Sequence, residues 1–388
     1  MRSKLNSDKT RLSQVYFAYF AILGVVSHYL GLYLHHLNLE PSMIGLVLAV
    51  MTIGRIAGPM VWANLPGLQS SPSCSIQSSC FLALISFSIL LFSHEPSVLM
   101  LALGGFAFFW SAALPQLESV AQSCLKGNAS AYSMVRIWGS ISFICLVIIA
   151  GWFFEIYGIV FSVEMFTIGL LTLLFISSFR LPEADLEASD DQVYTGTLAK
   201  LKQANVMAFM FASFLLQLSF ATYYGFFSIY LTELGYTGYQ IGIMISVGVI
   251  AEIGIFLIAG RILNRYSLKA LFLFCLLITS FRWFGISLWG ENIALLFLLQ
   301  IIHAFSYGLF HVAAQKFIHV EFKGKGQAKG QALYMSLSFG IGGALGSVVS
   351  GYSWEFVGQQ TFALSALLAL VAALLILMFY KTIRVQDK

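Results

Sequence analysis

Two charged residues, Glu118 and Arg136, lie in a part of the chain that is otherwise apolar enough to cross a membrane. Glu118 lies nine residues before Gly127 and Arg136 nine residues after it, so a helical hairpin turning at Lys126–Asn128 would place both at one depth. At 1.5 Å per residue, this depth is about 13 Å from the turn. A charge in hydrocarbon costs at least about 3 kcal/mol, so such residues tend to be paired and functional. The pair is therefore a candidate binding site; the alternative is a buried ion pair that only fixes helix packing.

A second candidate group surrounds Glu252, near the centre of the apolar run SVGVIAEIGIF. A carboxylate there either pairs with a base from another helix or stays protonated, because desolvation disfavours its charged form. Arg282 lies near the middle of the next apolar run, and the following run presents His303, Tyr307 and His311 on one stripe of a helix. Since histidine titrates near neutral pH, this set could exchange a proton with little net buried charge. The alternative is ordinary polar packing between helices.

Aromatic residues near these charges form a third group of candidates. Tyr223 and Tyr224, together with Trp110 and Trp138, could line a cavity that accepts an aromatic solute. Interfacial belts or lipid-facing packing would explain any one of them equally well.

Membrane helices must position all these residues. The chain has 388 residues, of which 59% are hydrophobic and 10% charged, and its mean hydropathy is +0.85. Soluble globular domains do not have this composition. Windows of about 20 apolar residues predict twelve spans, near residues 12–35, 42–64, 74–93, 97–124, 130–154, 159–180, 205–233, 239–263, 269–289, 293–320, 329–354 and 360–381.

An internal repeat divides the predicted spans into two sets of six. A shift of 197 residues lays Ile44–Gly45 on Ile241–Gly242 and places Arg55 opposite Glu252, which makes Arg55 a weaker functional candidate. The offset covers an even number of spans, so the two halves run in the same direction, as in major facilitator transporters. We expect six-helix bundles at residues 1–180 and 205–388, joined by a polar linker at 181–204.

Positive charge orients the predicted spans. Of 21 Lys and Arg residues, Arg55, Arg136 and Arg282 fall well inside spans, and all the others fall at the termini or within a few residues of loops that join an even-numbered span to the next. The loops of the opposite face contain none. Both termini and the linker are therefore expected to be cytoplasmic, in a multi-pass protein of the cytoplasmic membrane.

Several function classes lack support in the sequence. The five cysteines form no C-x-x-C pair, so neither a disulfide framework nor a metal site is predicted. There is no G-x-S-x-G motif and no P-loop, which argues against serine hydrolysis and ATP-driven transport. The net charge of +4 belongs to loops and gives no evidence of nucleic-acid binding. We expect no enzymatic activity and no cofactor other than a coupling proton.

Three stretches carry a family resemblance. Val135–Ser140 (VRIWGS), the stretch from Tyr223 through Glu252, and Arg282–Trp283 resemble the phenylpropionate permease group of the major facilitator superfamily. The V-R-x-W-G-S motif is also similar to that of nucleoside–proton symporters. The superfamily loop signature is partly kept at Gly260–Lys269 and is essentially lost between the second and third spans. The resemblance extends over nearly the whole chain.

The resemblance implies roles for the charged residues. The group is similar to lactose permease, in which an acid on helix 4 and an arginine on helix 5 hold the substrate. There, an acid on helix 8, an arginine on helix 9 and a histidine on helix 10 serve substrate binding and proton coupling. By position, these roles would fall on Glu118, Arg136, Glu252, Arg282 and either His303 or His311.

The sequence thus predicts an all-α membrane protein with twelve transmembrane helices in two six-helix pseudo-repeats. We expect a monomeric secondary transporter that imports a small organic solute with protons by alternating access. The resemblance implies an aromatic carboxylate such as 3-phenylpropionate, which would suit a cavity holding arginines and aromatic rings, since guanidinium binds carboxylate through two parallel hydrogen bonds. Alternatives are a sugar or nucleoside proton symporter, a drug exporter, or a non-transporting receptor or scaffold. The expected substrate ligands are Glu118, Arg136, Tyr223, Tyr224 and Trp138, and the expected coupling residues are Glu252, Arg282, His303 and His311.

Overall fold

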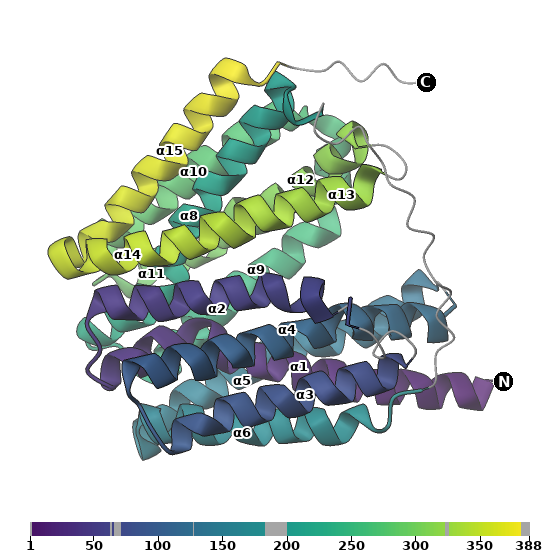
Figure 1. Ribbon diagram of the computed structural model, residues 1–388. Coiled ribbons are helices and arrows are strands. Elements are labelled where there is room, and N and C mark those ends of the chain that lie inside the picture. Colours follow the sequence, from purple (N-terminus) through teal and green to yellow (C-terminus); the bar gives the residue numbers. More distant parts are fainter. Residues whose placement is uncertain are drawn as a thin grey trace. The chain divides into compact units, whose positions relative to one another are not determined.

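The computed structural model describes residues 2–62, 64–65, 71–126, 128–182, 200–322 and 326–381, and this part of the chain consists of helices and short connections without strands (Figure 1). Backbone contacts divide the chain into two units. The first comprises Met1–Asp190 with Tyr224–Ile243, and the second comprises Asp191–Tyr223 with Met244–Lys388. Most of the predicted linker, residues 183–199, lies outside the described residues.

The first unit is built around its most buried helix, α1. In the most apolar part of this helix, 83% of the residues are buried. Helix α1 packs against α5 and α6, α2 packs against α4, and α3 packs against α4 and α6. The helices are α1 (Arg2–His36), α2 (Pro41–Trp62), α3 (Pro72–Ser88) with the short η1 (Ile89–Leu91), α4 (Pro96–Cys124), α5 (Ala129–Tyr157) and α6 (Ile159–Ser178).

Local sequence sets the ends of these helices. Helix α3 begins with Pro72 after Ser71, whose hydroxyl accepts a hydrogen bond from Cys74 N, and α5 begins after Asn128, whose side chain accepts one from Ala131 N. Such caps satisfy backbone donors that have no partner within the helix. Gly158 adopts a φ of +79° between α5 and α6, a conformation that favours glycine.

The second unit contains the remaining helices, except for Tyr224–Ile243, and two π-helical segments. Its elements are α8 (Ala204–Glu233), α9 (Gly238–Arg265), α10 (Leu268–Trp289), α11 (Ile293–Ile301), η2 (Ala304–Leu309), α12 (Phe310–Glu321), α13 (Gly326–Tyr334), η3 (Met335–Gly342), α14 (Gly343–Val357), η4 (Gly358–Gln360) and α15 (Thr361–Phe379). The division between the units falls inside α8 and α9. Segments η2 and η3 are π-helical, whereas the sequence predicted uninterrupted α-helices there.

Residues 224–243 join the first unit through close backbone contacts. A Cβ atom added at Gly31 of α1 would lie 1.8 Å from Gly225 O, and one added at Gly151 of α5 would lie 2.1 Å from Gly238 O. Only glycine permits helices to approach this closely, as in small-residue contacts of membrane helices.

Eleven helical stretches in the described chain are long and apolar enough to cross a membrane. Ten of them match single predicted spans. The last, Gly326–Phe379, has 54 residues and contains the two final predicted spans, which are separated at Gly358, where φ is +53°. The prediction of an all-α, multi-span membrane fold is confirmed.

A buried carboxylate on α6 links three elements of the first unit. Glu164 Oε1 accepts a hydrogen bond from the Tyr33 hydroxyl of α1 at 2.8 Å and lies 2.7 Å from His94 Nε2, in the connection before α4. Glu164 is 6% exposed. It lies inside a predicted span, yet the sequence analysis did not identify it as a candidate.

Candidate functional site

The structure brings Glu118 and Arg136 together in the first unit, as the hairpin geometry predicts. Arg136 Nε lies 3.7 Å from Glu118 Oε1, and the two side chains are 36% and 26% exposed, respectively. The chain reverses between α4 and α5 through Lys126, whose φ is +52°, and Asn128, which caps α5; Gly127 lies outside the described residues. Because the pair is partly exposed, it contributes little to stability and remains available to a ligand.

Aromatic rings surround the guanidinium group of Arg136. Its Cζ atom lies 4.0 Å from the ring centroid of Phe20 and 5.8 Å from that of Tyr16, within the range of cation–π attraction. The Tyr132 hydroxyl donates a hydrogen bond to Glu118 Oε2. The site thus combines a cation, a carboxylate held in place by a hydroxyl, and flat apolar surfaces.

Arg55 lies against a different aromatic group of the same unit. Its Cζ atom is 5.5 Å from the Trp110 ring centroid, and Trp110 stacks on Tyr19 with centroids 4.6 Å apart. The indole Nε1 of Trp110 is buried and has no hydrogen-bond partner among the described residues. Arg55 therefore contributes positive charge beside Trp110.

In the second unit, Glu252 pairs with His303. His303 Nε2 lies 3.7 Å from Glu252 Oε2, and their side chains are 7% and 17% exposed. Helix α9 supplies the carboxylate, and His303 immediately precedes η2. Of the two histidines considered from the sequence, the structure thus places His303 beside the carboxylate. Carboxylate and imidazole are both side-chain groups that exchange protons in proteins.

Arg282 is fully buried and anchored in a network on the neighbouring helices. Its Nε donates to Leu299 O at 2.9 Å, and Nη2 donates to Gln300 Oε1 at 3.1 Å. The same Gln300 oxygen accepts a hydrogen bond from the Tyr223 hydroxyl at 2.8 Å. The guanidinium also lies 4.5 Å from the Tyr223 ring centroid and 4.4 Å from that of Trp283. Arg282 is therefore held in one geometry by hydrogen bonds and ring contacts.

The rings of His303, Tyr307 and His311 form a column along this part of the chain. Neighbouring centroids are 5.4 and 6.3 Å apart, with interplanar angles of 6° and 9°. In an α-helix, each step of four residues turns by about 40°. The wider π-helical turn of η2, which lies between the histidines, reduces this drift and allows the rings to stack. Tyr223 continues the column, with its centroid 6.0 Å from that of His303.

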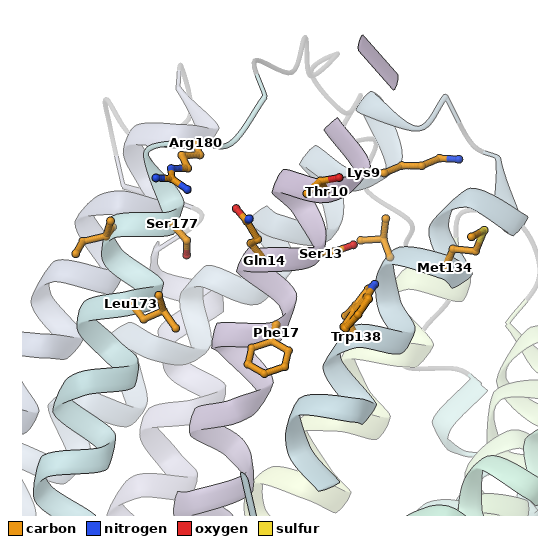
Figure 2. A pocket seen from close by; sticks show the side chains of 12 residues that line it. Lys9, Thr10, Ser13, Gln14, Phe17, Met134, Trp138, Leu173, Ser177 and Arg180 are labelled. Atoms are coloured by element: carbon orange, nitrogen blue, oxygen red, sulfur yellow. The ribbon is translucent and has the colours of Figure 1, made fainter. Parts of the chain in front are cut away.

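Two further expected substrate ligands, Tyr224 and Trp138, have other neighbours. Tyr224 belongs to the first unit, where its ring meets His28 edge-on at 5.4 Å. Trp138 lines a pocket between α1, α5 and α6 (Figure 2) and is 45% exposed. It follows Arg136 by two positions, about 200° around the helix, so the structure does not bring it to the Glu118–Arg136 pair.

The sequence analysis missed two polar residues that complete these sites. Tyr132 lies one helical turn before Arg136, and Gln300 lies three residues before His303. Residues three or four apart are neighbours on a helix surface. Their spacing from Arg136 and His303 could therefore have identified them from the sequence.

Comparisons with known proteins agree with this fold. The model of the family described as "MFS_1 like family" matches residues 9–364. The chain is 29% identical to the probable 3-phenylpropionic acid transporter of Escherichia coli (strain K12) over 93% of this chain and 95% of that protein. It is 23% identical to the maltose permease of Geobacillus stearothermophilus over 89% of this chain and 88% of that protein. The crystal structure of the nucleoside transporter NupG superposes with a TM-score of 0.84 at 18% identity, covering 97% of this chain and 99% of that one.

Proposed function

The chain belongs to the MFS_1 like family and is a multi-pass membrane transporter of the major facilitator type, and from this premise we propose that it imports a small aromatic carboxylate together with protons. 3-Phenylpropionate is the substrate we favour. The observation that carries the proposal is the partly exposed Arg136, flanked by the Phe20 and Tyr16 rings.

Substrate recognition follows from the chemistry of this pair. A guanidinium group binds a carboxylate through two parallel hydrogen bonds, and the rings beside Arg136 offer flat apolar surfaces to a phenyl group. Glu118 competes for the same guanidinium, so an incoming carboxylate must displace it or share Arg136 with it. Tyr132 holds Glu118 in position by its hydrogen bond. We infer that this competition makes substrate binding reversible.

Proton coupling is assigned to Glu252 and His303. A proton taken up by Glu252 neutralises the carboxylate and removes its electrostatic attraction to His303, which lies 3.7 Å away. Arg282, fixed by Gln300 and Leu299, keeps positive charge in this unit. Substrate anion and proton would then move together in an alternating-access cycle. We further propose a monomer in the cytoplasmic membrane with both termini in the cytoplasm, no resident cofactor and no enzymatic activity.

A neutral-solute symporter is the second candidate. It is favoured by the maltose permease and by a putative nucleoside transporter of Escherichia coli (strain K12), to which the chain is 27% identical over 66% of its length. Polar side chains such as Glu118 and Tyr132 would also suit hydroxyl groups of a sugar or nucleoside.

The test measures proton movement in proteoliposomes on addition of 3-phenylpropionate, with maltose and a nucleoside in parallel. The expected result is substrate-dependent alkalinisation outside the vesicles that disappears in Glu252→Gln. Vesicles without protein are essential, because the neutral form of a weak acid also carries protons through lipid. Glu355→Gln is the matched control, since it makes the same chemical change at an exposed position of α14.

Each outcome decides one part of the proposal. A response to maltose or the nucleoside, and none to 3-phenylpropionate beyond the empty vesicles, would overturn the substrate. A full response in Glu252→Gln would move the coupling site to another group, with Glu118 and the histidines tested next.

A further inference from the structure

A pocket of the first unit has a lining that contains neither Glu118 nor Arg136. It has a volume of about 630 Å³ and is formed by α1, α5 and α6 together with Arg180, just beyond α6. This volume is in the range of about 300–1,000 Å³ that is usual for ligand sites. None of the described residues that line it is acidic. Figure 2 shows α1 as the floor of the pocket, with the side chains of α5 and α6 on either side.

The lining changes from cationic to apolar along α1 and α6. Lys9 and Arg180 lie at one end, and Phe17 and Leu173 lie at the other (Figure 2). Eight residues separate Lys9 from Phe17, which corresponds to about 12 Å along a helix. Hydroxyl groups of Ser13 and Ser177 lie between the two ends. The pocket therefore fits an elongated ligand with an anionic head and an apolar tail.

Exposed apolar side chains border the same pocket. Met134, Trp138, Leu173 and Ile176 are between 45% and 63% exposed. On a membrane transporter, exposed apolar residues on such helices meet acyl chains. Positive charge, meanwhile, gathers at the cytoplasmic ends of membrane helices. With both termini in the cytoplasm, as proposed above, the cationic end of the pocket lies at the headgroup level of the cytoplasmic leaflet, and its apolar part lies in the acyl region.

We propose that this pocket binds an anionic phospholipid of the cytoplasmic leaflet. Lys9 and Arg180, which lie on opposite sides of the cationic end (Figure 2), attract the anionic headgroup. Ser13 and Ser177 offer hydrogen bonds to the phosphate or glycerol oxygens, and one acyl chain lies along Phe17 and Leu173. Basic pockets between membrane helices on the cytoplasmic side recognise lipid headgroups in this way. A zwitterionic headgroup is disfavoured, because it would place its own ammonium group beside two cations without an acidic partner in the lining.

Trp138 provides a local reporter for this site. The full-length protein is placed in phosphatidylcholine nanodiscs, and phosphatidylglycerol with brominated acyl chains is added, since bromine quenches tryptophan fluorescence on contact. The Trp138 signal is obtained as the difference between the wild type and Trp138→Phe. Brominated phosphatidylglycerol is expected to quench it at lower mole fractions than brominated phosphatidylethanolamine. Each cation is expected to favour binding of the anionic lipid over the zwitterionic lipid by roughly five-fold.

Variants separate this site from general attraction to a charged membrane. Lys9→Ala with Arg180→Ala should raise the phosphatidylglycerol needed for half-quenching by about tenfold or more, whereas Lys9→Arg with Arg180→Lys should preserve it. Arg261→Ala with Arg265→Ala is the matched control, because it removes two exposed cations from α9 in the other unit. All variants are first checked for a single symmetric peak in gel filtration.

Three results would overturn the proposal. One is equal quenching by the two brominated lipids in the wild type. Another is that the folded Lys9→Ala, Arg180→Ala protein needs the same mole fraction of brominated phosphatidylglycerol for half-quenching as the Lys9→Arg, Arg180→Lys protein. The third is displacement of brominated phosphatidylglycerol by 3-phenylpropionate at transport concentrations, which would make the pocket a solute site. Persistence of quenching in the presence of excess inorganic phosphate supports recognition of the whole lipid.

Discussion

Gly308 lies directly against the side chain of Glu252: a Cβ atom added at Gly308 would lie 2.9 Å from Glu252 Cγ and 2.8 Å from Ile255 Cγ2. The absence of a side chain at this position of η2 therefore allows Glu252 to sit beside His303. The carboxylate and its partner are positioned by backbone proximity as well as by charge.

Gly308→Ala is expected to displace Glu252 and to lower proton-coupled transport by roughly tenfold or more, because small displacements at a reacting group are costly. The measurement is substrate-driven proton movement in proteoliposomes. Gly254→Ala is the control, since no atom lies within 4 Å of its added Cβ. Equal activity of both variants would show that Glu252 does not depend on this contact.

Arg282→Lys should destabilise the protein by about 2–4 kcal/mol. Lysine cannot reproduce the bonds from Nε to Leu299 O and from Nη2 to Gln300 Oε1, so the buried network would lose two hydrogen bonds from a charged group. Unfolding in detergent would be followed by fluorescence. Arg265→Lys changes an exposed arginine in the same way and should leave the transition within about 0.5 kcal/mol of the wild type. A similar shift in both variants would contradict the role of the buried network.

Tyr132→Phe should weaken substrate binding about threefold to tenfold while changing stability by less than about 1 kcal/mol. It removes the hydroxyl that donates to Glu118, and the Glu118–Arg136 pair is too exposed to contribute much to stability. Binding would be measured calorimetrically. Because the two groups act on each other, the effects of Tyr132→Phe and Glu118→Gln should not add. Additive effects in the double variant would indicate that Tyr132 acts independently.

Gly31→Ala should destabilise the first unit by about 1–3 kcal/mol, because its Cβ would overlap Gly225 O at 1.8 Å. The two backbones would have to move apart to accommodate it. Thermal unfolding in detergent gives the readout. Gly169→Ala, on α6 and with no atom within 4 Å of its Cβ, should be neutral or stabilising, since alanine favours helix. A neutral Gly31→Ala would show that the close approach is not required.

The spans and the Glu118–Arg136 contact could be predicted from the sequence for a simple reason. Charges are conspicuous in an apolar run, and a hairpin with equal arms brings two residues to one depth. The neighbours of Trp138, in contrast, could not be predicted from its residue type and its closeness to Arg136 in the sequence. It is close to Arg136 in the chain, but two positions along a helix place it on another face.

Contacts between distant segments could not be predicted in this way. His94 and Glu164 are 70 positions apart, and no local pattern joins a loop histidine to a carboxylate on α6. Tyr223 meets Gln300 across 77 positions. Such pairs depend on how helices pack side by side, which hydrophobic periodicity does not specify. The π-helical geometry of η2 likewise depends on tertiary packing more than on residue type.

The π-helical segment η2 also bears on how this chain is aligned with its relatives. A π turn inside an α-helix accommodates an additional residue without breaking the helix, so chain length can change there at small structural cost. Loss of one residue from η2 would restore α-helical geometry and leave His311 on nearly the same face of the helix as His303, since seven α-helical steps turn by about 700°. In a relative that is one residue shorter at this point, the residue equivalent to His311 would therefore follow the equivalent of His303 by seven positions instead of eight. Counting residues from either end of this helix would then pair histidines that do not occupy equivalent places.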